Sequence, residues 1–139
     1  FEYKDERIDA VFVMSPAIMF PELERASAEL SVPVMLVNGD EFFEVPYAPL
    51  VTIYENAPPP RYLVRLKKVD HMTAVDSTLA NPAARLVLPG FRHGFAKKAD
   101  AYKAYSASFF DTYLKGELER AKVLETPVNR HATVQAVPK

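Results

Sequence analysis

The sequence predicts an α/β fold, a doubly wound and mostly parallel sheet of about three strands with flanking helices. Short apolar runs alternate along the chain with segments whose apolar residues follow helical spacing, which is the order of elements in such a sheet. The runs are apolar at consecutive positions, as in strands that are buried on both faces. We therefore expect parallel strands between two layers of helix.

Three segments are predicted as strands. Residues 8–14 form a near-continuous apolar run that stops at Ser15-Pro16, and residues 32–37 form a second run of this kind. Residues 62–66 are fewer and more polar, so we expect this third strand to lie at an edge of the sheet.

Helices are predicted between and after these strands. Segments 21–30 and 46–57 carry apolar residues at helical spacing. A longer helix is expected from Asp100, as N-cap, to Gly116, as C-cap. Residues 72–100 are expected to form a long loop with room for a short helix or strand. One domain would then span residues 1–120, followed by a surface strap over residues 121–139.

Composition narrows the class of protein. A chain of 139 residues is long enough for one domain with a core and too short for two. Its formal charge of -1 gives no electrostatic reason to expect nucleic acid, and no apolar run approaches the roughly 18 residues of a membrane span. Without cysteine it has no disulfide and no thiolate nucleophile. Because it opens at Phe1 and not at Met, we expect a piece of a longer protein.

Two candidate catalytic side chains follow predicted strands. Asp40 comes directly after Gly39 at the end of the second strand, and Asp70-His71 follows the third. Parallel strands end at one edge of a sheet, where ligands of open α/β sheets bind, so the acid and the histidine are expected to meet there. An acid that orients a histidine forms two thirds of a hydrolytic triad.

The third member of a triad is not evident. A nucleophile elbow has the pattern Gly-x-Ser-x-Gly, and no serine here has that setting. Gly90 and Gly94 are the only glycines four apart, and they enclose Phe91-Arg92-His93. Ser15 ends a predicted strand without an elbow, so we expect a structural role for it.

In their order, these segments resemble the C-terminal half of an α/β-hydrolase, closest to the dienelactone-hydrolase-like and platelet-activating-factor-acetylhydrolase-like esterases. The strand before Ser15-Pro16 is similar to the one that follows the nucleophile helix in those enzymes, and the run into Gly39-Asp40 is similar to their acid-bearing strand. Residues 62–71 resemble their last strand and histidine loop, and residues 109–116 their closing helix. The resemblance covers roughly residues 7–120.

The resemblance implies a serine hydrolase that acts on small-molecule carboxylic esters and needs no cofactor or metal. His71 would carry the proton and Asp40 would hold its imidazole. The serine and most of the oxyanion hole would come from an N-terminal half of the same hydrolase or from a complementary chain. The fold would be the C-terminal part of a hydrolase sheet.

Alternatives remain for both residues. His93 lies in a Pro-Gly-x-x-His-Gly-Phe string that also resembles a histidine loop of dienelactone hydrolases. Glu41 and Glu44 compete with Asp40, because the family's commonest acid position is occupied here by Phe42. The same departure favours another interpretation, a non-catalytic hydrolase-like binding module with a degenerate site.

Overall fold

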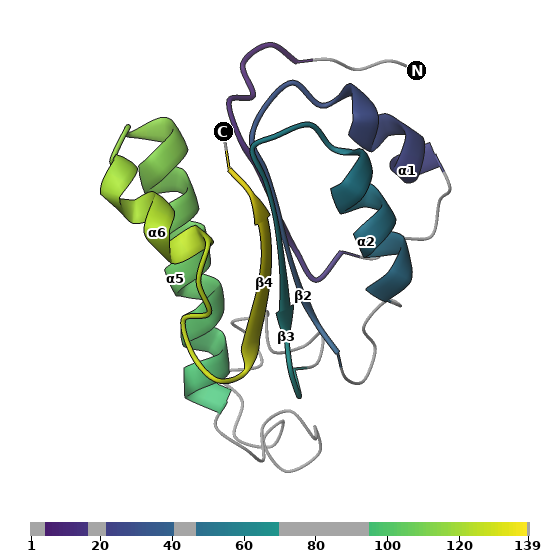
Figure 1. Ribbon diagram of the computed structural model, residues 1–139. Helices are drawn as coiled ribbons and strands as arrows, with labels where there is room; N and C mark the ends of the chain where they lie inside the picture. The colour runs from purple at the N-terminus through teal and green to yellow at the C-terminus, as the bar shows by residue number, and fades with distance from the viewer. Residues whose placement is uncertain (1–4, 17–21, 41–46, 70–94, 139) are drawn as a thin grey trace.

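The computed structural model describes residues 5–16, 22–40, 47–69 and 95–138, which form a four-stranded mixed sheet with flanking helices (Figure 1). The strand order is β1-β2-β3-β4. The first three strands are parallel, and the last runs antiparallel to β3. Their bounds are β1 Val11–Met14, β2 Val34–Gly39, β3 Arg61–Leu66 and β4 Ala132–Val137.

Helices cover both faces of the sheet (Figure 1). On one face lie the two crossover segments, α1 with the 3-10 turn η1, and α2. On the other face lie the long helix α5 and the short α6, joined through the 3-10 turn η4. The bounds are α1 Glu22–Ala26, η1 Ser27–Glu29, α2 Tyr47–Asn56, α5 Phe95–Leu114, η4 Leu118–Arg120 and α6 Ala121–Leu124.

Alternate side chains of the central strands supply two apolar cores. Met35 and Val37 of β2 pack with the α5 side, together with Phe109. Val34 and Leu36 pack with α2 on the opposite face. Since successive side chains of a strand point to opposite faces, a strand that is apolar throughout needs both layers. The two cores are the physical reason for the consecutive apolar runs.

The predicted α/β class is confirmed at the level of a mixed sheet with helices on both faces. Each of the first three strands lies within or next to its predicted segment, and so do α1 and α2. The prediction that the third strand lies at an edge is wrong. β3 is interior, between β2 and β4, and four of its six residues are buried.

Two further expectations are corrected. The long helix begins at Phe95 and not at Asp100, so Asp100 is not its N-cap. The expected surface strap, residues 121–139, contains α6 and the strand β4, whose residues pair along the whole of β3. Backbone hydrogen bonds with β3 therefore tie the tail into the sheet.

Gly116 ends the long helix as predicted. Its φ is +76°, a left-handed conformation that glycine adopts without steric cost. The Glu117 N–H then donates to the Asp111 carbonyl at 3.0 Å, which turns the chain back along the helix. Over the described ranges, no helix combines the length and the apolar character that crossing a membrane requires.

Candidate functional site

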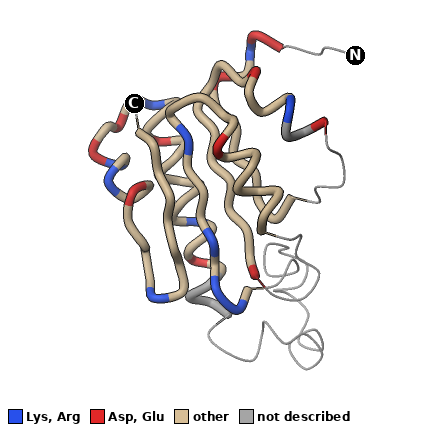
Figure 2. Tube along the Cα trace, turned by 45° about the vertical axis from the view of Figure 1, so that its right-hand side comes forward, with Lys and Arg blue, Asp and Glu red and all other residues tan. Residues whose placement is uncertain are grey.

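The carboxyl ends of β1, β2 and β3 meet at one edge of the sheet because these strands are parallel. Ser15 follows β1, Asp40 follows β2, and the residues up to Val69 continue from β3. Lys and Arg residues gather around the same end of β3 (Figure 2). This edge is where the sequence places the candidate acid and the candidate histidine.

Asp40 ties the end of β2 to the end of β3. Its main-chain N–H donates to the Val69 carbonyl at 3.1 Å. Its carboxylate Oδ1 accepts the N–H of Lys68 at 2.6 Å, and its Oδ2 lies 3.2 Å from the Arg65 guanidinium. Lys68 has a φ of +58°, so the carboxylate caps a tight turn of strained backbone. The side chain of Asp40 is 20% exposed.

Arg65 lies between a carboxylate and an aromatic ring. Its guanidinium pairs with Asp40 and also lies over the Tyr47 ring, 5.1 Å from the centroid. Burial raises the pKa of Tyr47, and the nearby Arg65 charge opposes that rise. The guanidinium is thus positioned by two contacts, on the side of the sheet where α2 begins.

Two buried polar atoms lie at the Asp40–Arg65 ion pair, one on the neighbouring Asn38 and one on Arg65 itself. Arg65 is in register with Asn38 of β2, which is fully buried. The Asn38 amide nitrogen donates to the Gly39 carbonyl at 2.9 Å, but its Oδ1 and the Arg65 Nε make no hydrogen bond with the residues that the structure describes. Within those residues, one acceptor and one donor are unsatisfied at the carboxyl edge, which is uncommon for buried groups.

The other predicted site residues lie outside the described residues. These are His71 and Asp70 after β3, the alternatives Glu41 and Glu44 in the loop after Asp40, and His93; Phe42 and Asp76 lie outside them too. Among the candidate catalytic residues, Asp40 alone lies within the described ranges. Val69, two residues before His71, is the described residue closest to that histidine in the sequence.

Ser15 has the structural contacts expected of it. It is 4% exposed, its N–H donates to the Val37 carbonyl at 2.9 Å, and its Oγ lies 3.0 Å from the Tyr102 hydroxyl. This hydrogen bond joins the end of β1 to α5. The φ of Ser15 is +44°, which is uncommon for a residue other than glycine. No local pattern in the sequence indicates this hydroxyl pair, because Ser15 and Tyr102 are 87 positions apart.

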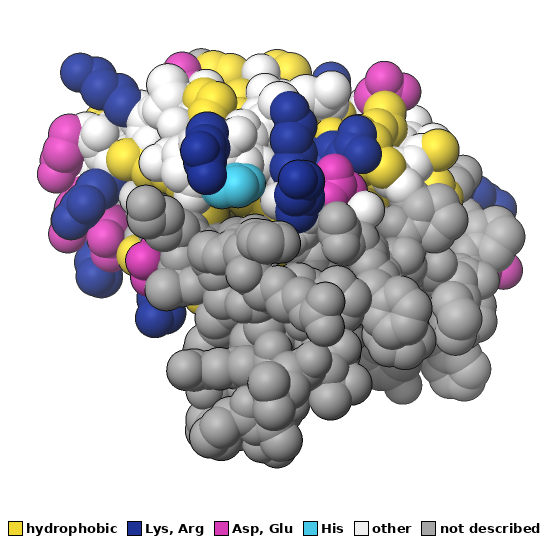
Figure 3. Space-filling model, turned by 90° about the horizontal axis from the view of Figure 1, so that it is seen from below, with side chains coloured by type: hydrophobic (Ala, Val, Ile, Leu, Met, Phe, Trp, Pro, Cys, Tyr) yellow, Lys and Arg dark blue, Asp and Glu magenta, His cyan; other side chains and the backbone are white. Residues whose placement is uncertain are grey.

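A basic cluster at the same edge was not predicted. It consists of Arg65, Lys67, Lys68 and Arg130, with His131 among them; Figure 3 shows basic side chains on both sides of the histidine. Lys67 N–H donates to the His131 carbonyl at 2.8 Å, and Arg130 Nε donates to the His131 ring at 3.3 Å. The cluster forms because β4 pairs with β3. The sequence does not predict it, since it indicates no strand in the tail.

The described residues contain no group of three or more His, Cys, Asp or Glu side chains that could hold a metal ion. No protein-family model and no curated protein matches the chain. The site is therefore interpreted from its own geometry and from the resemblance that the sequence carries.

Proposed function

We propose that this chain supplies the histidine and the acid of a serine α/β-hydrolase that acts on carboxylic esters. The nucleophilic serine would lie on an N-terminal segment of the same protein or on a complementary chain. His71 would take the serine proton during attack on the ester carbonyl and return it to the leaving alcohol. The acid would fix the imidazole and stabilise its protonated form.

One observation carries this proposal, the hydrogen bond of 3.1 Å between Asp40 N–H and the Val69 carbonyl. The acid-bearing loop starts at Asp40, and His71 stands two residues beyond Val69. The main chain thus joins the two loops at their bases. Residues from neighbouring loops at the carboxyl edge of parallel strands form the usual ligand site of α/β sheets.

The contacts of the Asp40 carboxylate affect which residue could serve as the catalytic acid. Both carboxylate oxygens of Asp40 already have partners, the Lys68 N–H and the Arg65 guanidinium. A carboxylate oxygen can accept more than one hydrogen bond, so Asp40 can still accept one from an imidazole. Glu41 and Glu44 remain its alternatives. If Glu41 or Glu44 is the catalytic acid, the role of Asp40 is to stabilise the turn at Lys68, before His71.

A non-catalytic binding module is the second candidate function. The pairing of the Asp40 carboxylate with Arg65 favours it, because a carboxylate engaged in holding a turn needs no catalytic role to explain its contacts. In that case the carboxyl edge would bind a ligand without turning it over.

The test begins with the intact mass of the natural product that contains these residues, which shows whether a further segment accompanies them. A fluorophosphonate probe, which reacts with activated serines, is then applied to that product. We expect it to label a serine outside residues 1–139. Absence of labelling in the natural product would overturn the hydrolase proposal and favour the binding module.

Single variants assign the roles. His71→Ala is expected to abolish labelling, whereas His93→Ala, its matched control, is expected to leave most of it. Asp40→Asn, Glu41→Gln and Glu44→Gln are compared in the same assay, because each keeps the size of the side chain and removes its charge. The variant with the largest loss of ester turnover identifies the acid. The reverse result for the histidines would transfer the role to His93.

A further inference from the structure

The strand β1 has the composition of an interior strand although, among the described residues, it pairs on one side alone. Its sequence Val-Phe-Val-Met is apolar at every position. The other edge strand, β4, alternates: Ala132 is buried, and Thr133 and Gln135 are exposed. Alternation is typical of an edge strand with one solvated face, whereas a continuous apolar run is typical of a strand buried on both faces.

Among the described strands, none pairs with the outer side of the β1 backbone. Val11 donates its N–H group to the Pro33 carbonyl just before β2, and Ser15 donates its own to the Val37 carbonyl within β2, at 2.9 Å each. Since N–H groups of a strand alternate between its two sides, those of Phe12 and Met14 point away from β2. No strand of the described ranges pairs there. A further strand can therefore extend the sheet at this edge.

On the α5 face of β1, apolar side chains are left in contact with solvent. Met14 is 43% exposed, and Phe110 of α5 is 36% exposed. Phe12 joins them to the core, because its ring lies 6.0 Å from those of both Phe109 and Phe110. The aromatic core of this face thus continues up to the open edge.

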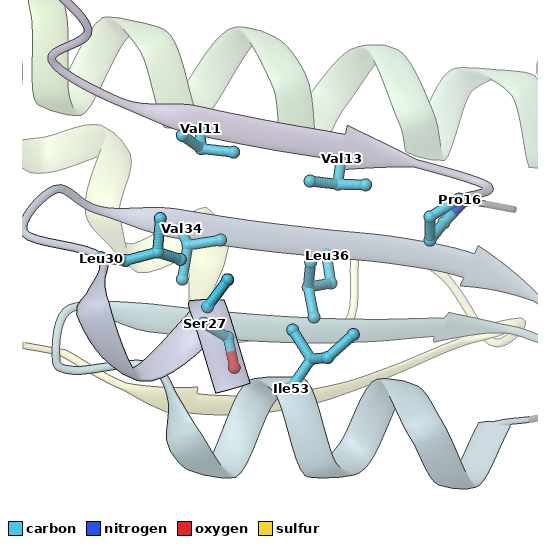
Figure 4. Close-up of a pocket in the computed structure, with 9 residues that line it drawn as sticks. Val11, Val13, Pro16, Ser27, Leu30, Val34, Leu36 and Ile53 are labelled. Atoms are coloured by element: carbon cyan, nitrogen blue, oxygen red, sulfur yellow. The ribbon is translucent and has the colours of Figure 1, made fainter. Parts of the chain in front are cut away.

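On the opposite face of β1, the packing between sheet and helices is incomplete. A hollow of about 200 Å³ lies over β1 and β2, beside α1 and α2, and the described residues that line it are all uncharged. In Figure 4, side chains of both strands and of α2 point into it. The strand residues are Val11, Val13, Val34 and Leu36, and α2 contributes Ile53. The hollow continues the apolar core between the sheet and α2, since these same residues belong to or pack against that core.

The topology of the sheet indicates which kind of element would cover the outer edge of β1 and the hollow. The crossovers from β1 to β2 and from β2 to β3 both lie on the α1–α2 face and step in the same direction across the sheet. Crossovers between parallel strands are right-handed in nearly all cases. A strand that stepped into β1 in the same direction would therefore carry its crossover helix on this face, over the hollow.

We propose that the outer edge of β1 and the adjacent hollow form a docking surface for one βα unit, a parallel strand paired with β1 followed by an apolar-faced helix that fills the hollow. A second copy of this chain fits less well. Pairing of two β1 edges would extend the sheet, but the helices of each copy already cover its own strands, and the hollow would stay open. The inference does not depend on ester chemistry and holds for any βα unit of this form.

Hydrogen exchange of single amides in β1 tests the proposal. The N–H of Val13 faces β2 and serves as the reference within the same strand. In the isolated chain, we expect Phe12 and Met14 to exchange about 100-fold faster than Val13. In the natural product, all three amides are expected to exchange at similar rates. Fast exchange of Phe12 and Met14 in both samples would overturn the proposal.

Two variants and a concentration series complete the test. Met14→Asp places a charge on the exposed edge and is expected to restore fast exchange of Phe12 in the natural product. Leu118→Asp is the matched control, because Leu118 is also apolar and is 74% exposed, but lies in η4. Equal effects of the two variants contradict the assignment.

Protection of the β1 amides that rises with concentration in the isolated chain, with a dimer mass, identifies a second copy and overturns the βα unit. Protection without fluorophosphonate labelling leaves the docking surface intact and refutes the hydrolase alone.

Discussion

The main chain of Asp40 is hydrogen bonded to that of Val69, so the ends of two neighbouring parallel strands form one unit. The Asp40 carboxylate also stabilises this connection, because it accepts a hydrogen bond from the Lys68 N–H. Any role of the loops that follow these residues depends on this connection between the two strand ends.

Removal of the Asp40 carboxylate should destabilise the fold. Asp40→Ala leaves the Lys68 N–H without its acceptor, and we expect a loss of about 1–2 kcal/mol in the free energy of unfolding by urea. Asp40→Asn keeps an acceptor and loses the ion pair with Arg65, which is half exposed, so it should lose at most about 1 kcal/mol. Equal losses for the two variants would show that the charge, and not the hydrogen bond, holds the turn.

The hydroxyl pair of Ser15 and Tyr102 should behave as one interaction. Ser15→Ala and Tyr102→Phe are each expected to lower the free energy of unfolding by about 1 kcal/mol. The double variant should lose less than the sum, because both changes remove the same hydrogen bond. Additive losses in the urea titrations would contradict a direct coupling.

Glycine at position 15 separates the strain from the hydrogen bond. Ser15→Gly loses the hydroxyl but relieves the positive φ, so it should be more stable than Ser15→Ala by about 1 kcal/mol. Thermal and urea unfolding of the two variants measure this difference. Equal stabilities would mean that the backbone at Ser15 carries no strain.

The aromatic core beside α5 should depend most on Phe109. This side chain is fully buried, and its ring lies 5.1 Å from that of Tyr113 and 6.3 Å from that of Tyr62. Phe109→Ala should cost about 3–5 kcal/mol. Phe110→Ala is the matched control, because its neighbouring ring is 36% exposed, and it should cost clearly less in the same urea titration. Similar losses would contradict the assigned packing.

Stability should fall in alkaline solution through buried tyrosines. Burial, followed by the hydrogen bond of 2.7 Å to Tyr113, raises the pKa of Tyr62 well above its ordinary value. The folded state then keeps a proton that the unfolded chain loses above about pH 10, so this stabilisation is complete below that pH and is lost as the pH rises further.

Tyr62→Phe tests this dependence. The variant removes one titrating group, so between pH 9 and pH 11 its free energy of unfolding should decline less steeply than that of the parent, by up to about 1.4 kcal/mol per pH unit. Tyr54→Phe is the comparison, since Tyr54 is buried in the opposite core. Parallel pH profiles for Tyr62→Phe and the parent would refute the contribution.

The sequence predicts the three parallel strands well, because the apolar runs of segments 8–14 and 32–37 favour buried strands and the more polar segment 62–66 still holds an apolar stretch from Tyr62 to Val64. It does not predict β4, although the alternation from Ala132 to Val137 is typical of an edge strand, because this segment follows a polar stretch that Pro127 breaks. Its partner β3 is distant in sequence, so the pairing is not encoded locally. The same missing pairing made β3 look like an edge strand.

The candidate site follows the same division. The place of Asp40 could be predicted because it ends a buried run. Its partner Arg65 could not, because the contact depends on the register that sets Arg65 beside Asn38. The basic cluster around His131 depends on β4 in the same way. Residues fixed by local pattern were predictable, and those brought together by strand pairing were not.

The position of β3 between β2 and β4 has a consequence for the order of biosynthesis. Its pairing with β2 can form once Leu66 has left the ribosome, but its other side stays open until α5, α6 and finally β4 have been made. Throughout that interval, the nascent chain would expose one side of β3, a strand that is buried in the folded protein, with unsatisfied backbone groups. Termination of translation shortly before Ala132 would make that display permanent, and we expect such products to aggregate or to be degraded.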